Sequence, residues 1–337
     1  MKTKYNNFDT SLRRLPWSDN QNQTKVQSMI SATVNEWYEA KHRRTSIEEL
    51  EFINSIVPIR CHHCPSKSFI KYGYRNGLKV YKCKECGRKF TNLTNTIFDS
   101  KKVPITEWIE FLLHLFEFHS IKTSSRDNRN SSSTGNYWLK KVFKILKNIQ
   151  KDVILKNKVY LDELFFPVIK SKTILSDNGK KLRGISRNKI CVAVAIDEET
   201  MAIIVEPTSK PSDSSTWNAM GKIIQPKSHL IHDQERSHGI LIRKLNLTSE
   251  TYDTNFTKGL TDKENPLDPI NNIHSLIKRF MKQHGGYNRD NLQDWMNLVW
   301  FILTPPNDVY SKIEKFIKIA ICTPKRVKYR DVMTKKH

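Results

Sequence analysis

Apolar positions follow helical spacing in the first half of the chain and strand-like runs in the second. In Gln23–Ile56 and again from Pro104 to His119, apolar residues recur every three or four positions, which predicts amphipathic helices. Thr134 has the character of an N-cap for a third helix. Residues 122–133 are almost wholly polar, so a middle helix there would have little to bury. These pieces would assemble a helix-turn-helix.

From Lys158 onward the pattern changes to short apolar runs rich in β-branched residues, which is typical of buried strands. The predicted order is three strands followed by alternating helices and strands, β-β-β-α-β-α-β-α. The strands are expected at Val159–Lys170, Asn188–Asp197, Met201–Pro207, His229–His232 and Thr251–Asn255, and the helices at Asp213–Ile224, His238–Leu245 and Pro269–Gln283. This order predicts the α/β class, with a mixed five-stranded sheet and helices packed on it.

The length of 337 residues leaves room for two or three domains. The longest purely apolar runs, such as Ile190–Ile196, are far shorter than the roughly 20 residues that a membrane span needs. The first residues also lack the apolar stretch of a signal peptide. Secretion and membrane insertion are therefore disfavoured.

Positive charge is the strongest feature of the composition, with a formal net charge of +23. Two clusters hold much of it: Ser311–His337 has nine Lys and Arg against two acids, and Pro167–Ile190 has seven against one. A solubilising surface would explain either cluster alone. Two clusters in so basic a chain favour a nucleic-acid partner, because cations set against phosphates release condensed counterions.

Four of the six cysteines form two CxxC pairs, Cys61 with Cys64 and Cys83 with Cys86, with 18 residues between the pairs. This spacing suits tetrahedral Zn²⁺, since each pair binds from a tight turn while the intervening segment returns as a hairpin. Asn76-Gly77 is a hairpin-turn dipeptide. We therefore predict a zinc ribbon. Such a ribbon is a DNA-binding module, a structural element, or both.

The neighbouring histidines and the two other cysteines are weaker candidates for zinc ligands. His62 and His63 lie inside the first CxxC pair and are alternative zinc ligands of lower rank. Cys191 lies in an apolar strand and Cys322 is isolated, so both are interpreted as packing residues.

Two aspartates, Asp162 and Asp233, lie in or at the end of predicted apolar strands. A carboxylate there is costly unless it is paired, solvated or bound to a cation. Acids at strand ends are common, but two on neighbouring strands make an oxygen-rich site suited to Mg²⁺ or Mn²⁺. The period-two rule puts Glu163 on the opposite face of its strand, which makes it a poor companion ligand.

A third element of the constellation lies on the predicted helix over Pro269–Gln283. Asn271, His274 and Lys278 are spaced i, i+3 and i+7 and therefore share one helical face. This stripe is either a solvated face or part of the acidic site.

The arrangement resembles the zinc-ribbon transposases of bacterial insertion sequences, in the fifteen-ninety-five family. The resemblance runs from about residue 58 to 304. Its matching stretches are Cys61–Cys86, Val159–Glu163, Ile190–Ile196, Leu230–His238, Ile270–Arg279 and Gly285–Asn297. It implies an RNase H-like catalytic domain of the DDE type, in the variant whose third acid is Asn.

By this resemblance Asp162, Asp233 and Asn271 are the magnesium or manganese ligands, and Lys278 is the basic residue that contacts DNA. Asn272 and His274 are the alternatives for the third position. Cys61, Cys64, Cys83 and Cys86 hold a structural zinc. The expected activity is metal-dependent cleavage of element ends and joining of their 3′ ends to target DNA. Double-stranded DNA is the expected partner, bound by a homodimer or larger homo-oligomer at the nucleoid of a bacterial cytoplasm.

The expected organisation has five parts. They are an N-terminal helical segment (1–57), the zinc ribbon (58–100), a helical segment (101–152), the catalytic domain (153–304) and a basic C-terminal tail (305–337). Two other functions are open on the sequence: a non-catalytic DNA-binding regulator, which explains the charge and the ribbon, and a metal-dependent structure-specific nuclease without strand transfer.

Overall fold

The computed structural model describes residues 47–99, 104–128, 130–182, 184, 186–261 and 264–333. They form two compact units: one contains the chain up to Ile145 together with Asp308 onward, and the other is Leu146–Asn307. Of the helix predicted over Gln23–Ile56, the described part is α3 (Ile47–Ser55); residues 23–46 lie outside the described residues. Among the described helices, none has the length and apolarity that crossing a bilayer demands.

The ribbon is a three-stranded antiparallel sheet of β1 (Phe69–Arg75), β2 (Leu78–Cys83) and β3 (Lys89–Thr91). Asn76 and Gly77 join β1 to β2 with φ of 51° and 78°, as a type I′ hairpin turn requires. Aromatic rings of Phe69, Tyr81 and Phe90 pack against one another at 5.5 Å between centroids. The predicted hairpin between the two CxxC pairs is therefore present.

The rest of the first unit is helical: α4 (Ile105–Phe116), α5 (Ile121–Asp127), α6 (Ser132–Leu146), α12 (Val309–Cys322) and α13 (Tyr329–Met333). Trp108 of α4 stacks on Trp138 of α6 at 4.3 Å. Phe116 of α4 meets Phe316 of α12 at 6.4 Å. Helix α12 lies in the segment described from its charge as a tail, yet it buries a continuous apolar stripe: Ile313, Phe316, Ile317, Ala320 and Ile321.

Helix α5 forms although its sequence is polar. Ser124 and Ser125 are buried, and their hydroxyls donate to the carbonyls of Ser120 and Ile121, one turn back. Its packing against α6 needs a small partner, because a Cβ at Gly135 would lie 1.9 Å from the Ser125 hydroxyl oxygen. Small side chains with locally satisfied hydroxyls replace the apolar face that the sequence lacks.

Several predicted helix and strand ends shift in the structure. Helix α6 begins at Ser132, and Ser131 rather than Thr134 supplies the capping oxygen, accepting from the Thr134 N–H at 3.2 Å. Helix α7 (Asp213–Met220) ends before the predicted Ile224, and Ser212 caps its start through a capping box with Ser215. The last strand lies earlier than predicted, at β8 (Thr248–Thr251).

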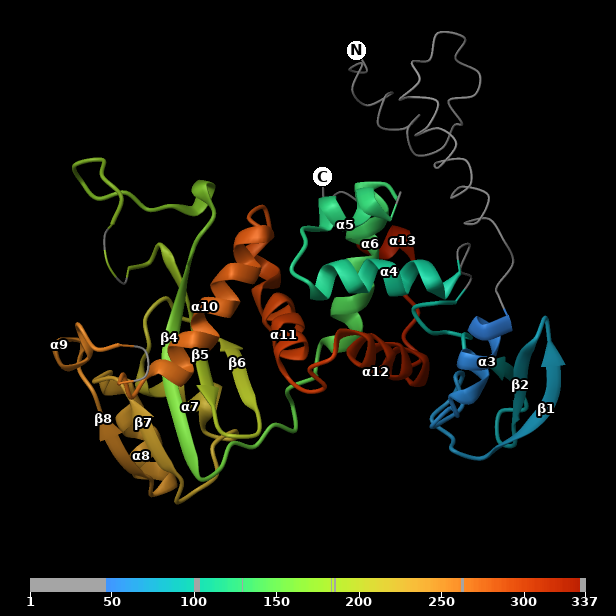
Figure 1. Ribbon diagram of the computed structural model, residues 1–337, viewed down its shortest axis with the longest axis horizontal. Coiled ribbons are helices and arrows are strands. Elements are labelled where there is room, and N and C mark those ends of the chain that lie inside the picture. Colours follow the sequence, from blue (N-terminus) through green and yellow to red (C-terminus); the bar gives the residue numbers. More distant parts are fainter. Residues whose placement is uncertain are drawn as a thin grey trace, which may run out of the picture. The chain divides into compact units, whose positions relative to one another are not determined.

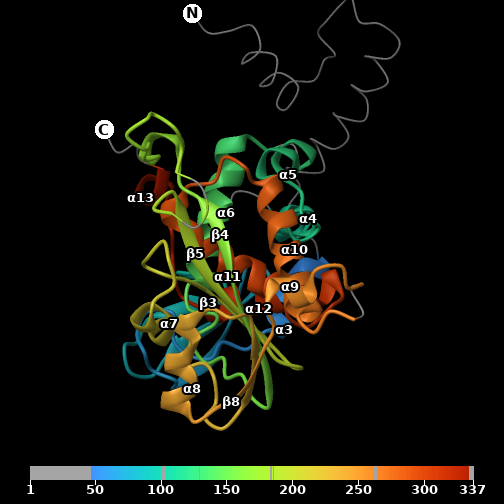
Figure 2. The ribbon, with the colours of Figure 1, turned by 90° about the vertical axis from the view of Figure 1, so that its left-hand side faces the viewer.

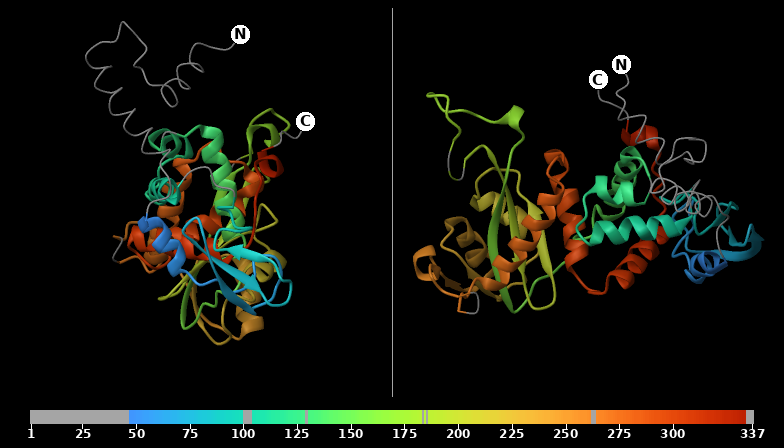
Figure 3. Two further views of the ribbon diagram at one scale, coloured as in Figure 1. Left: turned by 90° about the vertical axis from the view of Figure 1, so that its right-hand side faces the viewer. Right: turned by 45° about the horizontal axis from the view of Figure 1, so that its top comes forward.

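The second unit contains the predicted five-stranded mixed sheet (Figure 1). Its order is β6-β5-β4-β7-β8, in which β6 (Met201–Val205), β5 (Lys189–Ile196) and β4 (Lys158–Pro167) are antiparallel neighbours. β7 (His229–His232) and β8 run parallel to β4. The 168–188 segment, joining β4 to β5, projects beyond the end of the sheet (Figure 3, right).

Helices cover both faces of this sheet (Figure 2). On one face α7 and α8 (Gly239–Leu245) bury Val159, Leu161 and Ala193 of the sheet against Met220 and Leu241. The other face carries α10 (Asp268–Gln283), which follows the short α9 (Thr254–Thr257).

The outer edge of β6 is covered by glutamine side chains. Gln150 bonds both the N–H and the C=O of Ile203, and Gln293 of α11 (Leu292–Leu303) accepts from the N–H of Val205 at 2.7 Å. These amides satisfy an edge that would otherwise pair with another strand.

Candidate active site

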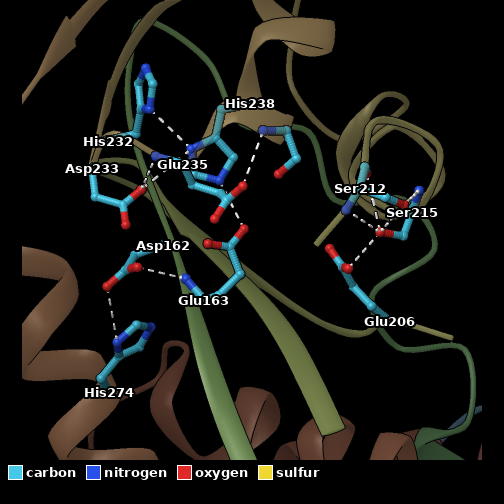
Figure 4. A network of polar contacts seen from close by, with 11 residues as sticks. Asp162, Glu163, Glu206, Ser212, Ser215, His232, Asp233, Glu235, His238 and His274 are labelled. Atoms are coloured by element: carbon cyan, nitrogen blue, oxygen red, sulfur yellow. Dashed lines mark hydrogen bonds and ion pairs between the residues drawn. The ribbon is translucent and has the colours of Figure 1, made fainter. Parts of the chain in front are cut away.

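The register of the parallel pair β4 and β7 brings Asp162 and Asp233 together. Leu161 pairs with His232 as the last residue pair of this ladder, so each aspartate is the next residue on its own chain. Parallel neighbours lie about 4.8 Å apart, and equivalent positions project to the same side. The carboxylate oxygens of Asp162 and Asp233 lie within 4.8 Å of one another (Figure 4).

The environment of Asp162 disfavours a second negative charge. Burial raises the pKa of Asp162 to about 7, and the charge of Asp233 adds to this effect. One oxygen, Oδ1, accepts from the backbone N–H of Glu163 at 2.7 Å. Two close, partly buried carboxylates repel each other, and a hard dication bound by both would offset this repulsion. Their oxygens are ligands that Mg²⁺ and Mn²⁺ prefer, so the residues present fit either ion.

Glu163 is closer to this pair than the sequence indicates. Its carboxylate lies within 4.8 Å of those of Asp162 and Asp233, although its side chain leaves β4 on the face covered by α7 and α8. The two faces meet here because β7 ends at His232, one residue short of the level of Asp162. The predicted face of Glu163 is therefore correct, but strand periodicity does not reveal its approach to the two aspartates.

A buried chain of histidines supports Glu163. His238 Nε2 donates to Glu163 Oε1 at 2.8 Å, and His238 Nδ1 lies 3.0 Å from Nδ1 of His232. Burial alone would lower the pKa of His238, but the hydrogen bond and charge of Glu163 raise it overall. Burial lowers the pKa of His232 to about 4, so its ring is neutral and its Nδ1 accepts a hydrogen bond from the Nδ1–H of His238.

The role of these histidines was not predicted from the sequence. Their signal was present, since His232 and His238 flank Asp233 within seven residues. Spacing alone did not distinguish a buried hydrogen-bonded pair from surface residues.

Helix α10 faces the aspartates with His274 rather than Asn271 in direct contact. His274 Nδ1 lies 3.5 Å from Asp162 Oδ2, and the ring is buried. Burial lowers the pKa of His274 to about 4, and Lys278 adds to the effect. Asn271 and Lys278 are exposed, one turn before and one turn after. The structure thus brings Asp162, Asp233 and His274 together and leaves Asn271 and Lys278 on the solvent side of the same helix.

A pocket of about 640 Å³ opens where the carboxyl end of β4 meets the 168–188 segment and the Gly285–Arg289 turn. Three cationic side chains contribute to its lining: Lys181, Lys189 and Arg289. Arg289 lies over the ring of Tyr287 at 3.9 Å from its centroid. This basic pocket is on the same unit as the carboxylates.

The four predicted zinc ligands converge in the other unit. Sγ of Cys61 lies 3.8 Å from that of Cys86, and Sγ of Cys64 lies 3.7 Å from that of Cys83. A tetrahedral ion with Zn–S bonds of about 2.3 Å separates its sulfurs by about 3.8 Å. The backbone N–H of Cys86 lowers the pKa of Cys83 to about 6, which favours a thiolate. The four thiols therefore fit one zinc ion.

The two histidines beside these cysteines have other partners. His62 Nδ1 lies 2.7 Å from the carbonyl of Thr94, and His63 Nε2 lies 3.2 Å from that of Lys89. Cys191 is fully buried in the sheet, as a packing residue is expected to be.

The raised pKa of Asp162 predicts that the unit's stability depends on pH. The folded-state pKa is about 7 against 3.8 for the free group, so the folded protein binds more protons between these values. Its free energy of unfolding should therefore fall as pH rises from 4 to 7 and then level off. Asp162→Asn should remove this slope and stabilise the protein at pH 8 by on the order of 2–4 kcal/mol.

The measurement is urea unfolding across this pH range without added Mg²⁺, with zinc retained. Asp152→Asn, at a side chain that is 83% exposed, is the matched control and should leave the slope in place. An identical slope in wild type and Asp162→Asn would contradict the assignment.

No protein-family model matches the chain. A stretch of 89 residues is 29% identical to an uncharacterized protein in transposable element ISH50 of Halobacterium salinarum. The match covers 25% of this chain and 29% of that protein, so it spans less than a third of the relative's length.

Two solved structures align with parts of the chain at low similarity. The Mos1 strand transfer complex aligns with a TM-score of 0.26 at 14% identity, over 63% of this chain and 74% of that chain. A simian T-cell lymphotropic virus intasome, solved with PP2A regulatory subunit B56 gamma, aligns with a TM-score of 0.28 at 12% identity. This second alignment covers 44% of this chain and 48% of that chain.

Proposed function

We propose that the chain is a DNA transposase with an RNase H-like catalytic unit of the DDE type, from the fifteen-ninety-five family of insertion sequences. The observation that carries the proposal is the in-register pair Asp162 and Asp233 on neighbouring parallel strands, facing α10. The chain's likeness to a protein of a transposable element agrees with it. The formal charge of +23 agrees with a DNA partner.

In this proposal Asp162 and Asp233 hold the catalytic Mg²⁺ or Mn²⁺, with Asn271 in the third position. A dication held by Asp162 and Asp233 would supply the Lewis acidity that in-line displacement at phosphorus needs, for activating a water or 3′-hydroxyl and stabilising the leaving oxygen. Lys278, exposed on the same helix, contacts a phosphate next to the scissile bond. Glu163, held by His238, keeps the carboxylate cluster in one arrangement. Lys181 and Lys189, which line the basic pocket, contact phosphates of the DNA backbone beside the site.

The test is to incubate the purified full chain with Mg²⁺, DNA bearing its own element's end, and a target plasmid. We expect nicking at the element end and covalent joining of the 3′ end to the target. Metal-dependent nicking without joining would establish the nuclease instead. Binding without nicking would establish the DNA-binding regulator.

The third position of the site gives a sharper prediction. Asn271→Ala should lower the cleavage rate by about 10- to 100-fold, because its amide oxygen orients the metal rather than holding it. Asn271→Asp should retain activity and bind the metal more tightly. Lys278→Ala should weaken binding of the element end rather than the chemical step.

The observed contact of His274 with Asp162 defines the alternative outcome. A neutral imidazole is itself a metal ligand, so His274→Ala is assayed beside Asn271→Ala. Normal cleavage by a folded Asn271→Ala protein together with an inactive, folded His274→Ala protein would move the third ligand one turn along α10.

A further inference from the structure

Helix α4 ends in a Schellman motif whose side-chain pair is unusual. The N–H of His119 donates to the carbonyl of His114 at 2.9 Å, and that of Phe118 to Leu115 at 3.3 Å. Phe118 has φ of 69°, a left-handed conformation that glycine normally adopts at this position. The two residues that such a motif brings together are usually apolar. Here they are both histidines.

The two imidazoles face each other, and a carboxylate lies close to both. His114 Nδ1 and His119 Nδ1 lie 3.0 Å apart, with ring centroids at 5.1 Å and planes 24° from parallel. Asp127, the last residue of α5, completes the group, in which one ligand atom from each residue lies within 4.8 Å of the other two. Arg126 Nε donates to Oδ1 of Asp127 at 3.1 Å.

This geometry fits a tetrahedral ion. Two Zn–N bonds of about 2.0–2.1 Å at a tetrahedral angle separate the nitrogens by about 3.3 Å, close to the observed separation. A hydrogen bond between the two rings would explain the nitrogen separation alone. It would not explain why a carboxylate from another helix joins them, or why a β-carbon-bearing Phe adopts a strained conformation to bring them together.

We propose that His114, His119 and Asp127 form a second transition-metal site, with Zn²⁺ as its ion. Two imidazoles and a carboxylate are borderline ligands that select zinc, nickel or copper over magnesium and calcium. Three protein ligands leave a fourth coordination position for water. The ion links the carboxyl end of α4 to that of α5, and so fixes the corner between the first two helices of the α4–α6 segment. This site does not depend on the proposed transposition chemistry.

The test is a zinc count on the purified full chain after equilibration with Zn²⁺ and removal of excess metal. We expect two ions per chain in the wild type and one in His114→Ala and in His119→Ala. Asp127→Asn should lower the affinity of the second site for Zn²⁺ by about 10- to 100-fold. It alters an exposed side chain and so keeps the test informative even if a histidine variant misfolds.

Two variants are matched controls. His229→Ala removes a histidine that pairs with Glu250 instead of a second histidine, and Asp331→Asn removes an acid that, like Asp127, contacts the preceding arginine. Both should keep two zinc ions. Co²⁺ substitution separates the sites, because only the cysteine site gives thiolate-to-metal absorption. One ion per wild-type chain, or equal zinc loss in Asp127→Asn and Asp331→Asn, would overturn the proposal.

Discussion

Replacing Asp162 or Asp233 by alanine is expected to abolish Mg²⁺-dependent cleavage, lowering the rate by about 10³-fold or more. Each change removes one of the two carboxylates that would hold the metal, and the ladder of β4 and β7 offers no substitute at that level. DNA binding should stay within about 2-fold of wild type, because it depends on Lys and Arg elsewhere.

The measurement pairs a cleavage assay with a DNA-binding titration of the same preparations. Glu250→Ala is the matched control, since Glu250 is a half-exposed acid on β8, the strand beside β7. It should cleave at the wild-type rate. A folded Asp162→Ala or Asp233→Ala protein with wild-type cleavage would remove that aspartate from the mechanism.

Loss of the ribbon's zinc is expected to unfold the ribbon. Its buried cluster consists of Cys61, Tyr81, Cys83 and Phe90, so two of the four residues are predicted zinc ligands. Structural zinc in modules of this size contributes about 10–16 kcal/mol of apparent binding free energy, which no comparable core replaces. Cys83→Ser should therefore lose one zinc ion and expose β1 and β2 to proteases.

The measurement is zinc content together with limited proteolysis. Cys322→Ser, at a cysteine outside the cluster, should retain both the metal and the protection. A Cys83→Ser protein that lacks this zinc yet resists proteolysis like the wild type would show that the ribbon folds without its metal.

The parts of the fold that the sequence predicted depend on local chemistry. Asn76-Gly77 specifies its hairpin because the turn needs positive φ at both residues, and the two CxxC pairs then meet. The order of strands and helices along the second unit was predictable because its buried strands are continuous apolar runs. Asp162 and Asp233 were predicted to be neighbours for the same reason.

What the sequence did not predict depends on distant partners. The approach of Glu163 to the aspartates follows from where β7 ends, which periodicity along β4 does not reveal. Helix α5 depends on Gly135, ten residues away from Ser125, for a close approach. The buried stripe of α12 was not predicted because the lysines of this segment dominated its composition.

The first unit is built from two separate stretches of chain, and this has a consequence for synthesis. Phe116 of α4 packs against Phe316 of α12, and roughly 190 residues separate the two helices. At about 5–20 residues per second, the ribosome makes that interval in roughly 10–40 s. During this time the continuous Leu146–Asn307 unit is completed while the part of α4 that packs against α12 is uncovered. The nascent protein therefore exposes a chaperone-binding surface until its last helices emerge.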